Sequence, residues 1–176
     1  MKTTSICILL LFPFMVNSQN KMIKSNDSLQ PVTSVELLRY MGMWYEISLY
    51  PQRFEKGCEC TTAEYYMHSK YVEVRNTCKK NGKTKTIKGK AFVVPGSGNA
   101  KLKVQFFWPF KADYWIISLD KEYNWAVVSS PDKNYLWILS RKPKMDEDLY
   151  KKILDDLIRR GFEPDRIIKT KQDCLN

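Results

Sequence analysis

Residues 42–47 read Gly-Met-Trp-Tyr-Glu-Ile, a glycine followed by strand-forming residues, and residues 136–141 read Leu-Trp-Ile-Leu-Ser-Arg. If the strands that carry these stretches meet in a closed sheet, Trp44 and Arg141 lie at the same end of it. A guanidinium stacked on an indole face is favourable by about 0.5–2 kcal/mol, and Gly42 permits a tight entry into the first strand. The two stretches predict a barrel that is plugged at one end and open at the other.

Short runs of strand-forming residues alternate with turn signals along most of the chain. Runs at a spacing of roughly 8–12 residues are typical of an all-β barrel or sandwich. Eight runs fit an antiparallel up-and-down barrel, about the size at which a cavity holds one small ligand. The expected strands are residues 44–50, 60–67, 71–78, 84–94, 101–107, 114–120, 125–129 and 136–140.

One C-terminal α-helix is expected at residues 146–160, after the strands. Its apolar residues recur at helical spacing, its acidic start and basic end match the helix dipole, and Gly161 is placed to end it. We expect this helix to pack on the barrel wall. A helical turn at residues 35–41 and a last short strand at residues 166–170 complete the expected elements.

The N-terminus has the pattern of a secretory signal peptide, in which Lys2 precedes an apolar run at residues 6–16. This run is shorter than the roughly 20 residues that a membrane span needs, so cleavage is favoured over a signal anchor. We expect a signal peptide at residues 1–18, a flexible leader at 19–34 and one folded domain at 35–176.

Composition excludes several classes of function. The chain has 176 residues, a formal net charge of +10 and a single histidine. One histidine argues against a multi-histidine metal site, and no nucleophile–base pair is visible. The positive charge would attract nucleic acid, anionic headgroups or acidic ligands, or form a solvated basic surface. Export and the eight-strand pattern argue against nucleic acid.

Four cysteines lie in the expected folded domain: Cys58, Cys60, Cys78 and Cys174. An even number in an exported chain favours two disulfides. The Cys-Glu-Cys stretch also has the form of a partial metal site, but nothing near it completes a zinc set, so we expect no metal. Spacing leaves the pairing open, and a turn at residues 68–70 would place Cys60 opposite Cys78, with Cys58 then joined to Cys174.

The ordered motifs resemble the lipocalin family. Gly42 with Trp44, the Asp113–Tyr114 pair and Arg141 correspond to the three short motifs of that family. The resemblance is strongest to the bacterial outer-membrane lipocalins and apolipoprotein D, and it covers nearly all of residues 35–170. The matching segments are residues 40–47, 53–57, 62–65, 100–104, 106–110 and 135–141.

The resemblance implies a pairing of the cysteines and a cellular location. Cysteines at the positions of Cys58 and Cys78 occur together in many bacterial relatives, and Cys60 with Cys174 resembles an apolipoprotein D bridge. Bacterial relatives often carry a lipidated cysteine after the signal peptide, but residues 16–20 have none. We therefore expect a periplasmic or secreted protein, with outer-membrane association as a weaker alternative.

The resemblance also implies binding of a small lipophilic ligand, with fatty acids and lysophospholipids as the expected classes. Because alternate residues of a strand face the same way, Glu46 and Ser48 should point inward with Trp44. There Glu46 would bond to a headgroup hydroxyl or a neighbouring tyrosine. The candidate cavity or mouth residues are Glu46, Leu102, Val104, Phe106, Trp108, Tyr114 and Trp137.

Residues 107–110 read Phe-Trp-Pro-Phe and are expected in a loop at the open mouth. This loop is either a hydrophobic lip that admits acyl chains or touches a membrane, or a loop that packs on its own barrel. We expect a non-enzymatic lipid carrier without a cofactor, as a monomer or weak dimer that serves membrane maintenance or stress. The alternative is a lipocalin-fold enzyme or haem protein, for which His68 in a turn is a poor axial ligand.

Overall fold

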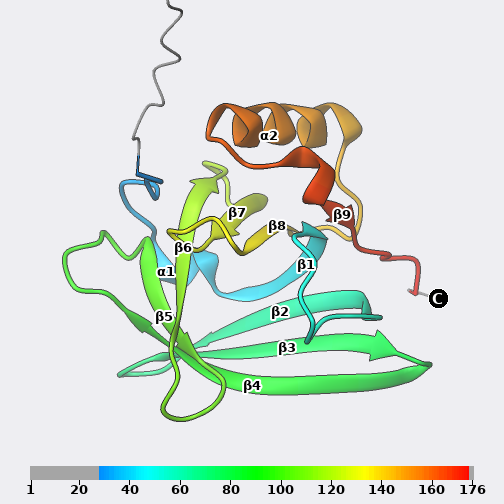
Figure 1. Ribbon diagram of the computed structural model, residues 1–176. Helices are drawn as coiled ribbons and strands as arrows, with labels where there is room; N and C mark the ends of the chain where they lie inside the picture. Colours follow the sequence, from blue (N-terminus) through cyan, green and yellow to red (C-terminus); the bar gives the residue numbers. More distant parts are fainter. Residues whose placement is uncertain (1–27, 175–176) are drawn as a thin grey trace, which may run out of the picture.

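The computed structural model describes residues 28–174, which form a β-barrel with a helix beside it (Figure 1). A short helix, α1 (Leu37–Tyr40), precedes the barrel and α2 (Glu147–Arg159) follows it. The strands of the barrel are β1 (Gly42–Leu49), β2 (Glu59–Met67), β3 (Val72–Lys80), β4 (Lys83–Val93), β5 (Lys101–Gln105), β6 (Ala112–Leu119), β7 (Trp125–Ser129) and β8 (Leu136–Ser140).

The strands follow one another around the barrel in sequence order. Each strand from β2 to β7 pairs with the strand that follows it in sequence. Strand β8 pairs with β1, and the pairing of β1 with β2 closes the barrel. All of these pairings are antiparallel, as short connections require. The expected eight-stranded antiparallel up-and-down barrel is confirmed.

A β-bulge in β1 reverses the side chains that follow Glu46. The register of β1 with β8 shifts between Glu46 and Ser48, and an extra residue sends the following side chains to the opposite faces. Ser48 Oγ accordingly lies 2.8 Å from Tyr150 Oη on α2, outside the barrel. The expectation that Ser48 points inward with Trp44 is therefore wrong.

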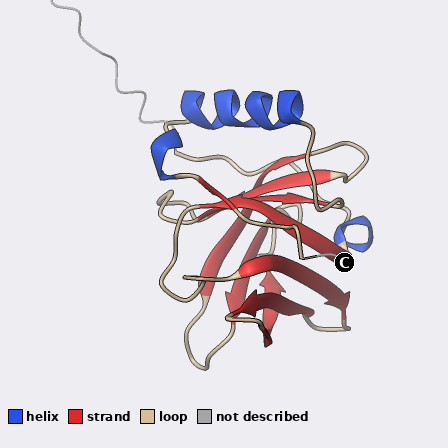
Figure 2. Ribbon diagram, turned by 90° about the vertical axis from the view of Figure 1, so that its right-hand side faces the viewer, coloured by secondary structure: helices blue, strands red, loops and turns tan. Residues whose placement is uncertain are grey.

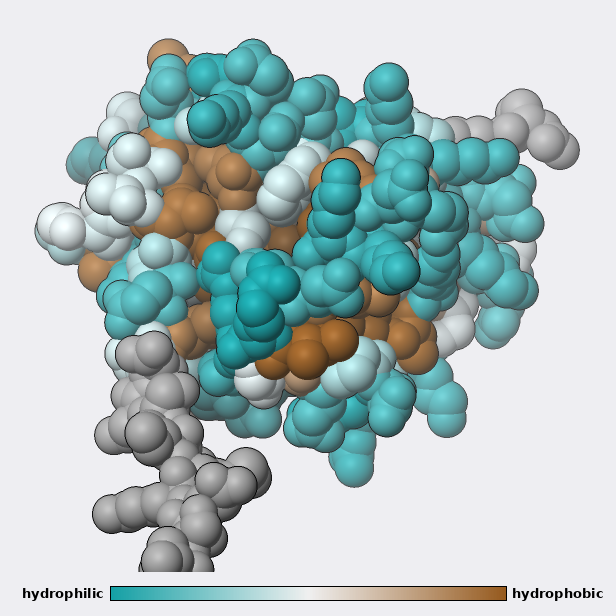
Figure 3. All heavy atoms as spheres, turned by 90° about the horizontal axis from the view of Figure 1, so that it is seen from above, coloured by the Kyte–Doolittle hydropathy of each residue, from teal (hydrophilic) through white to brown (hydrophobic). Residues whose placement is uncertain are grey.

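Helix α2 packs along the outer wall of the barrel, as expected (Figure 2). Asp146 caps its first turn by accepting a hydrogen bond from Leu149 N at 2.9 Å. Its outer face is mainly hydrophilic (Figure 3), and within residues 28–174 no helix has the length and apolar character to cross a membrane. The buried residues between the wall and the helix include Ile47, Ile117, Val127, Leu136, Ile138, Tyr150, Ile153 and Leu157.

Residues 28–34 are packed against the barrel. Leu29 is buried in the cluster under α2, and Val32 N donates a hydrogen bond to Ile116 O at 2.9 Å. The expectation of a flexible leader is wrong for these residues, because an apolar side chain and a backbone bond hold them. The expected signal peptide (1–18) and residues 19–27 of the expected leader lie outside the described residues.

After α2 the chain returns to the barrel. A 3₁₀ turn (Pro164–Arg166) leads into β9 (Ile168–Lys169), which pairs with β1. The strand expected at residues 166–170 is shorter because this turn occupies its start. Strand β9 lies beside the second half of β1, beyond the point at which β2 stops pairing with it.

Two disulfides fasten β2 and the tail. Cys58 is bonded to Cys78, and Cys60 is bonded to Cys174, which is the pairing that the resemblance implied. The alternative in which Cys60 joins Cys78 is wrong. Cys60 has a φ of +51° and its backbone N–H donates to Lys171 O at 2.7 Å, so it turns toward the C-terminal tail.

Candidate functional site

Trp44 and Arg141 plug one end of the barrel. Trp44 is fully buried, and the guanidinium of Arg141 lies 3.8 Å from the centre of its ring. The indole N–H donates to Tyr40 O at 2.8 Å. The guanidinium also donates hydrogen bonds to the backbone carbonyls of Arg39, Met41, Met43 and Tyr123. This is the arrangement expected from the meeting of the first and last strands.

Three tyrosine hydroxyls meet inside the barrel next to this plug. Tyr114 Oη lies 2.8 Å from the hydroxyls of both Tyr40 and Tyr65. Burial raises the pKa of Tyr65 to about 12 and raises the pKa values of Tyr40 and Tyr114 well above the ordinary range. All three hydroxyls therefore keep their protons at neutral pH. Tyr114, a candidate cavity or mouth residue, lies in this buried cluster.

Asp113, the neighbour of Tyr114 in sequence, forms an ion pair and does not join the tyrosine cluster. Its carboxylate forms an ion pair with Lys103 Nζ at 2.7 Å, and the two residues face each other across β5 and β6. Because both side chains are partly exposed, we expect this pair to contribute little to stability. Asp113 therefore links two strands on the outside of the barrel.

The inner wall is largely apolar. Leu102 and Val104 belong to the buried cluster inside the barrel, and Phe106 and Trp137 pack against it. A Cβ atom at Gly89 on β4 would lie 2.8 Å from Phe106 Cδ1, so the missing side chain makes room for this ring. These four candidate residues lie in or against the packed core inside the barrel.

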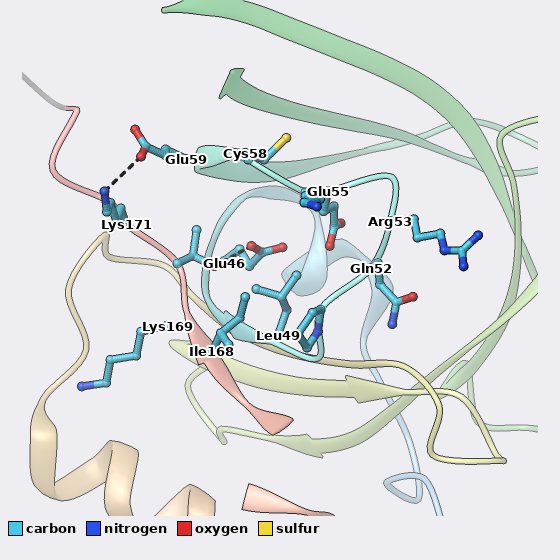
Figure 4. A pocket seen from close by; sticks show the side chains of 14 residues that line it. Glu46, Leu49, Gln52, Arg53, Glu55, Cys58, Glu59, Ile168, Lys169 and Lys171 are labelled. Carbon is cyan, nitrogen blue, oxygen red and sulfur yellow. Dashed lines mark hydrogen bonds and ion pairs between the residues drawn. The ribbon is translucent and has the colours of Figure 1, made fainter. Parts of the chain in front are cut away.

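A cavity of about 500 Å³ opens at the mouth between β1, the β1–β2 loop and β9 (Figure 4). Leu49 and Ile168 give it an apolar side, while Glu46 and Glu55 point their carboxyl groups into it. Among the candidate ligand residues, only Glu46 lines this cavity. Leu49 takes an inward position because the bulge in β1 reverses the faces.

Burial sets the protonation of the two carboxyl groups. Desolvation raises the pKa of Glu46 to about 8, with a further increase from the nearby Glu55, although a hydrogen bond from Thr170 opposes the shift. Desolvation also raises the pKa of Glu55 to about 7, against the effect of a hydrogen bond from the Trp137 indole. The cavity therefore holds protonated carboxyl groups near neutral pH.

Three polar side-chain atoms on β2 and β3 are buried without a partner. Thr61 Oγ1 on β2, and Arg75 Nε and Asn76 Oδ1 on β3, form no hydrogen bond within the described part of the chain. The Gln172 side chain donates to both Glu46 O and Thr61 O at 2.8 Å, so these two residues lie side by side. A buried polar atom without a partner is costly and calls for an explanation.

The loop at residues 107–110 joins β5 to β6 and is exposed. Phe107, Trp108 and Phe110 expose 69%, 87% and 77% of their surfaces, which contradicts the alternative that this loop packs on its own barrel. The up-and-down topology places the loop at the same end as the β1–β2 loop, where Phe54 is 65% exposed. Trp108 is therefore a mouth residue, outside the cavity.

Sequence reasoning missed Glu55, Leu49 and Thr170. Glu55 lies in a polar loop and Thr170 at the end of the chain's last strand, and no local pattern shows that either reaches Glu46. Leu49 was missed because a bulge breaks the alternation. Within residues 28–174, no group of three or more histidine, cysteine, aspartate or glutamate side chains is placed to hold a metal.

Comparison with known proteins identifies the family of this chain. The model of the lipocalin-like domain matches residues 35–172. The outer membrane lipoprotein Blc of Vibrio cholerae is 38% identical, covering 83% of this chain and 88% of its own length. Apolipoprotein D of Mus musculus is 34% identical, over 78% of this chain and 77% of its own length.

Solved structures agree on the fold. The structure of insecticyanin from the tobacco hornworm Manduca sexta has a TM-score of 0.67 with 22% identity, covering 82% of this chain and 85% of its own. Apocrustacyanin C2 has the same TM-score and identity, and the match covers 79% of this chain and 81% of apocrustacyanin C2. Together with the match over residues 35–172, the closed barrel and its Trp44–Arg141 plug show that this chain belongs to the lipocalin family.

Proposed function

We propose that this protein binds and carries single-chain lipids, fatty acids and lysophospholipids among them. Its family suggests binding and transport of small hydrophobic ligands. The observation that carries the finer proposal is the mouth cavity of about 500 Å³, in which apolar side chains such as Leu49 and Ile168 lie beside polar and charged ones. This combination suits an amphipathic ligand. No observation favours an enzyme or haem protein.

We expect Leu49→Trp to weaken lipid binding about tenfold, a loss of about 1.4 kcal/mol. The indole would occupy the cavity that Leu49 lines. Quenching of intrinsic tryptophan fluorescence by oleate and by a lysophospholipid measures the affinity. Leu38→Trp is the matched control, because Leu38 is 78% exposed on α1. Equal affinities for the two variants would contradict the assignment of this cavity.

The exposed aromatic residues at the mouth support a second part of the proposal, contact with an anionic lipid surface. Phe54 and the loop at residues 107–110 are exposed at this end. Lys83 and Lys85 are exposed on the β3–β4 hairpin, which the topology places at the same end. Aromatic side chains suit the membrane interface, and lysines attract anionic headgroups. Ligand could then pass between the membrane and the cavity.

Replacing Trp108 by alanine is expected to reduce binding to anionic vesicles about threefold to tenfold. Burial of aromatic area in the interface contributes roughly 25 cal/mol per Å², and Trp108 is the most exposed of the four aromatic residues. Co-sedimentation with phosphatidylglycerol vesicles measures the effect. Leu38→Ala, which removes an exposed apolar side chain from the opposite end, should bind like the parent protein.

The two disulfides and the similarity to an outer membrane lipoprotein support a periplasmic or secreted location. Disulfides persist in oxidising compartments. Under this proposal the protein works as a monomer or weak dimer outside the cytoplasm, exchanging lipid with a membrane during maintenance or stress.

A further inference from the structure

Two acidic side chains that point into the cavity form no ion pair within residues 28–174. Among the described residues, neither Glu46 nor Glu55 forms an ion pair with lysine or arginine, although cations lie around the rim. Lys171 instead pairs with Glu59 at 3.2 Å, and Lys169 pairs with Glu147 at 2.9 Å. Buried charges in proteins are normally paired. The carboxyl groups of Glu46 and Glu55 therefore have no cationic partner in the described part of the chain, although Arg53, Lys56, Lys169 and Lys171 also line the cavity.

Unpartnered polar atoms on the strands beside Glu46 add a second observation. Thr61 is 7% exposed, and Asn76 shares the inner face of β3 with the buried Val74. Thr61 Oγ1 and Asn76 Oδ1 each have an unused capacity to accept a hydrogen bond. A donor on a bound ligand would satisfy either of them.

We infer that the cavity selects single-chain amphiphiles with an ammonium headgroup, which the carboxylates of Glu46 and Glu55 would bind. An ammonium group offers three donors and one positive charge, which matches the two carboxylates that point into the cavity. The apolar wall at Leu49 and Ile168 takes the alkyl chain. This inference rests on the proposed function and adds the chemistry of the headgroup. Once Glu46 and Glu55 are ionised, a free carboxylate at the same position would meet like charge.

The protonation of the pair gives the inference a pH dependence. Burial raises the pKa values of Glu46 and Glu55 to about 8 and about 7, so both ionise further as the pH rises. A long-chain amine stays charged over this range, and its affinity should therefore rise between about pH 6 and about pH 8.5. Binding should also release protons. The other charged residues that line the cavity are Arg53, Lys56, Glu59, Lys169 and Lys171.

The experiment compares tetradecylamine, tetradecanoic acid and tetradecanol, each below its micelle concentration, by tryptophan fluorescence and calorimetry. At about pH 8.5 we expect the amine to bind at least about tenfold more tightly than the acid, with a smaller ratio at about pH 6. Glu46→Gln and Glu55→Gln should each lower amine affinity about tenfold and lower the affinity for the alcohol much less. Glu122→Gln is the matched control, since Glu122 is paired with Arg39 outside the cavity.

The outcomes separate the inference from the proposed function. If the alcohol binds but the amine is not preferred, or if the preference survives in the Glu46→Gln, Glu55→Gln double variant, the inference fails alone. If none of the three probes binds, the proposed function fails with it. Alcohol binding that persists in the single variants shows that they fold, so a selective loss of the amine supports the inference.

Discussion

Replacing Trp44 by alanine is expected to lower the free energy of unfolding by about 3–5 kcal/mol, the usual cost of deleting a large buried aromatic side chain. Trp44 is fully buried. Its loss would also remove the indole hydrogen bond to Tyr40 O and the surface on which the Arg141 guanidinium stacks. The plug would lose the indole ring, while the guanidinium of Arg141 would keep its hydrogen bonds to backbone carbonyl groups.

Urea unfolding followed by far-ultraviolet circular dichroism measures this effect. The matched control is Trp108→Ala, because Trp108 is 87% exposed, and its removal should change the free energy of unfolding by less than about 0.5 kcal/mol. A loss below about 1 kcal/mol in Trp44→Ala would show that the plug is not a main support of the barrel.

Removing the disulfide between Cys60 and Cys174 is expected to have a similarly large effect. The bond closes a loop with a sequence separation of 114 residues, and the entropy of so long a loop predicts a loss of about 4–5 kcal/mol in the Cys60→Ser, Cys174→Ser double variant. The same argument gives about 3 kcal/mol for Cys58→Ser, Cys78→Ser, whose loop separation is 20.

Thermal and urea unfolding of the two double variants under non-reducing conditions test this order. The comparison is internal, because both variants remove one bond from the same strand region. If the short-loop variant proved the less stable of the two, loop entropy would not govern the contribution of these bonds. The reduced parent protein should be less stable than either variant.

The sequence predicted those parts of the structure that follow from local repetition. Strand and helix periodicity located β1 to β8 and α2, and the meeting of the first and last strands predicted that Trp44 and Arg141 share one end. Ser48 was misplaced because a bulge depends on pairing between strands, which one strand does not encode. Leu29 was misplaced because one apolar residue in a polar segment gives no periodic signal.

The candidate site was less predictable than the fold. Glu46 was identified by its alternation with Trp44, but its partners come from far along the chain. Thr170 lies 124 residues away and Gln172 lies 126 residues away. The approach of Glu55 depends on how a polar loop folds over the mouth. Contacts of this kind depend on tertiary structure and leave no pattern in the strands that carry them.

The tail that follows β9 has a consequence for how the protein is made. Thr170 and Gln172 bond to Glu46, and Cys174 is joined to Cys60, so one side of the cavity is built from the latest-made part of the domain. Because a chain folds from its N-terminus during synthesis, β1 to β8 can assemble while this side is still missing. The nascent barrel would expose Glu46 to other molecules until residue 174 has emerged and the disulfide between Cys60 and Cys174 has formed.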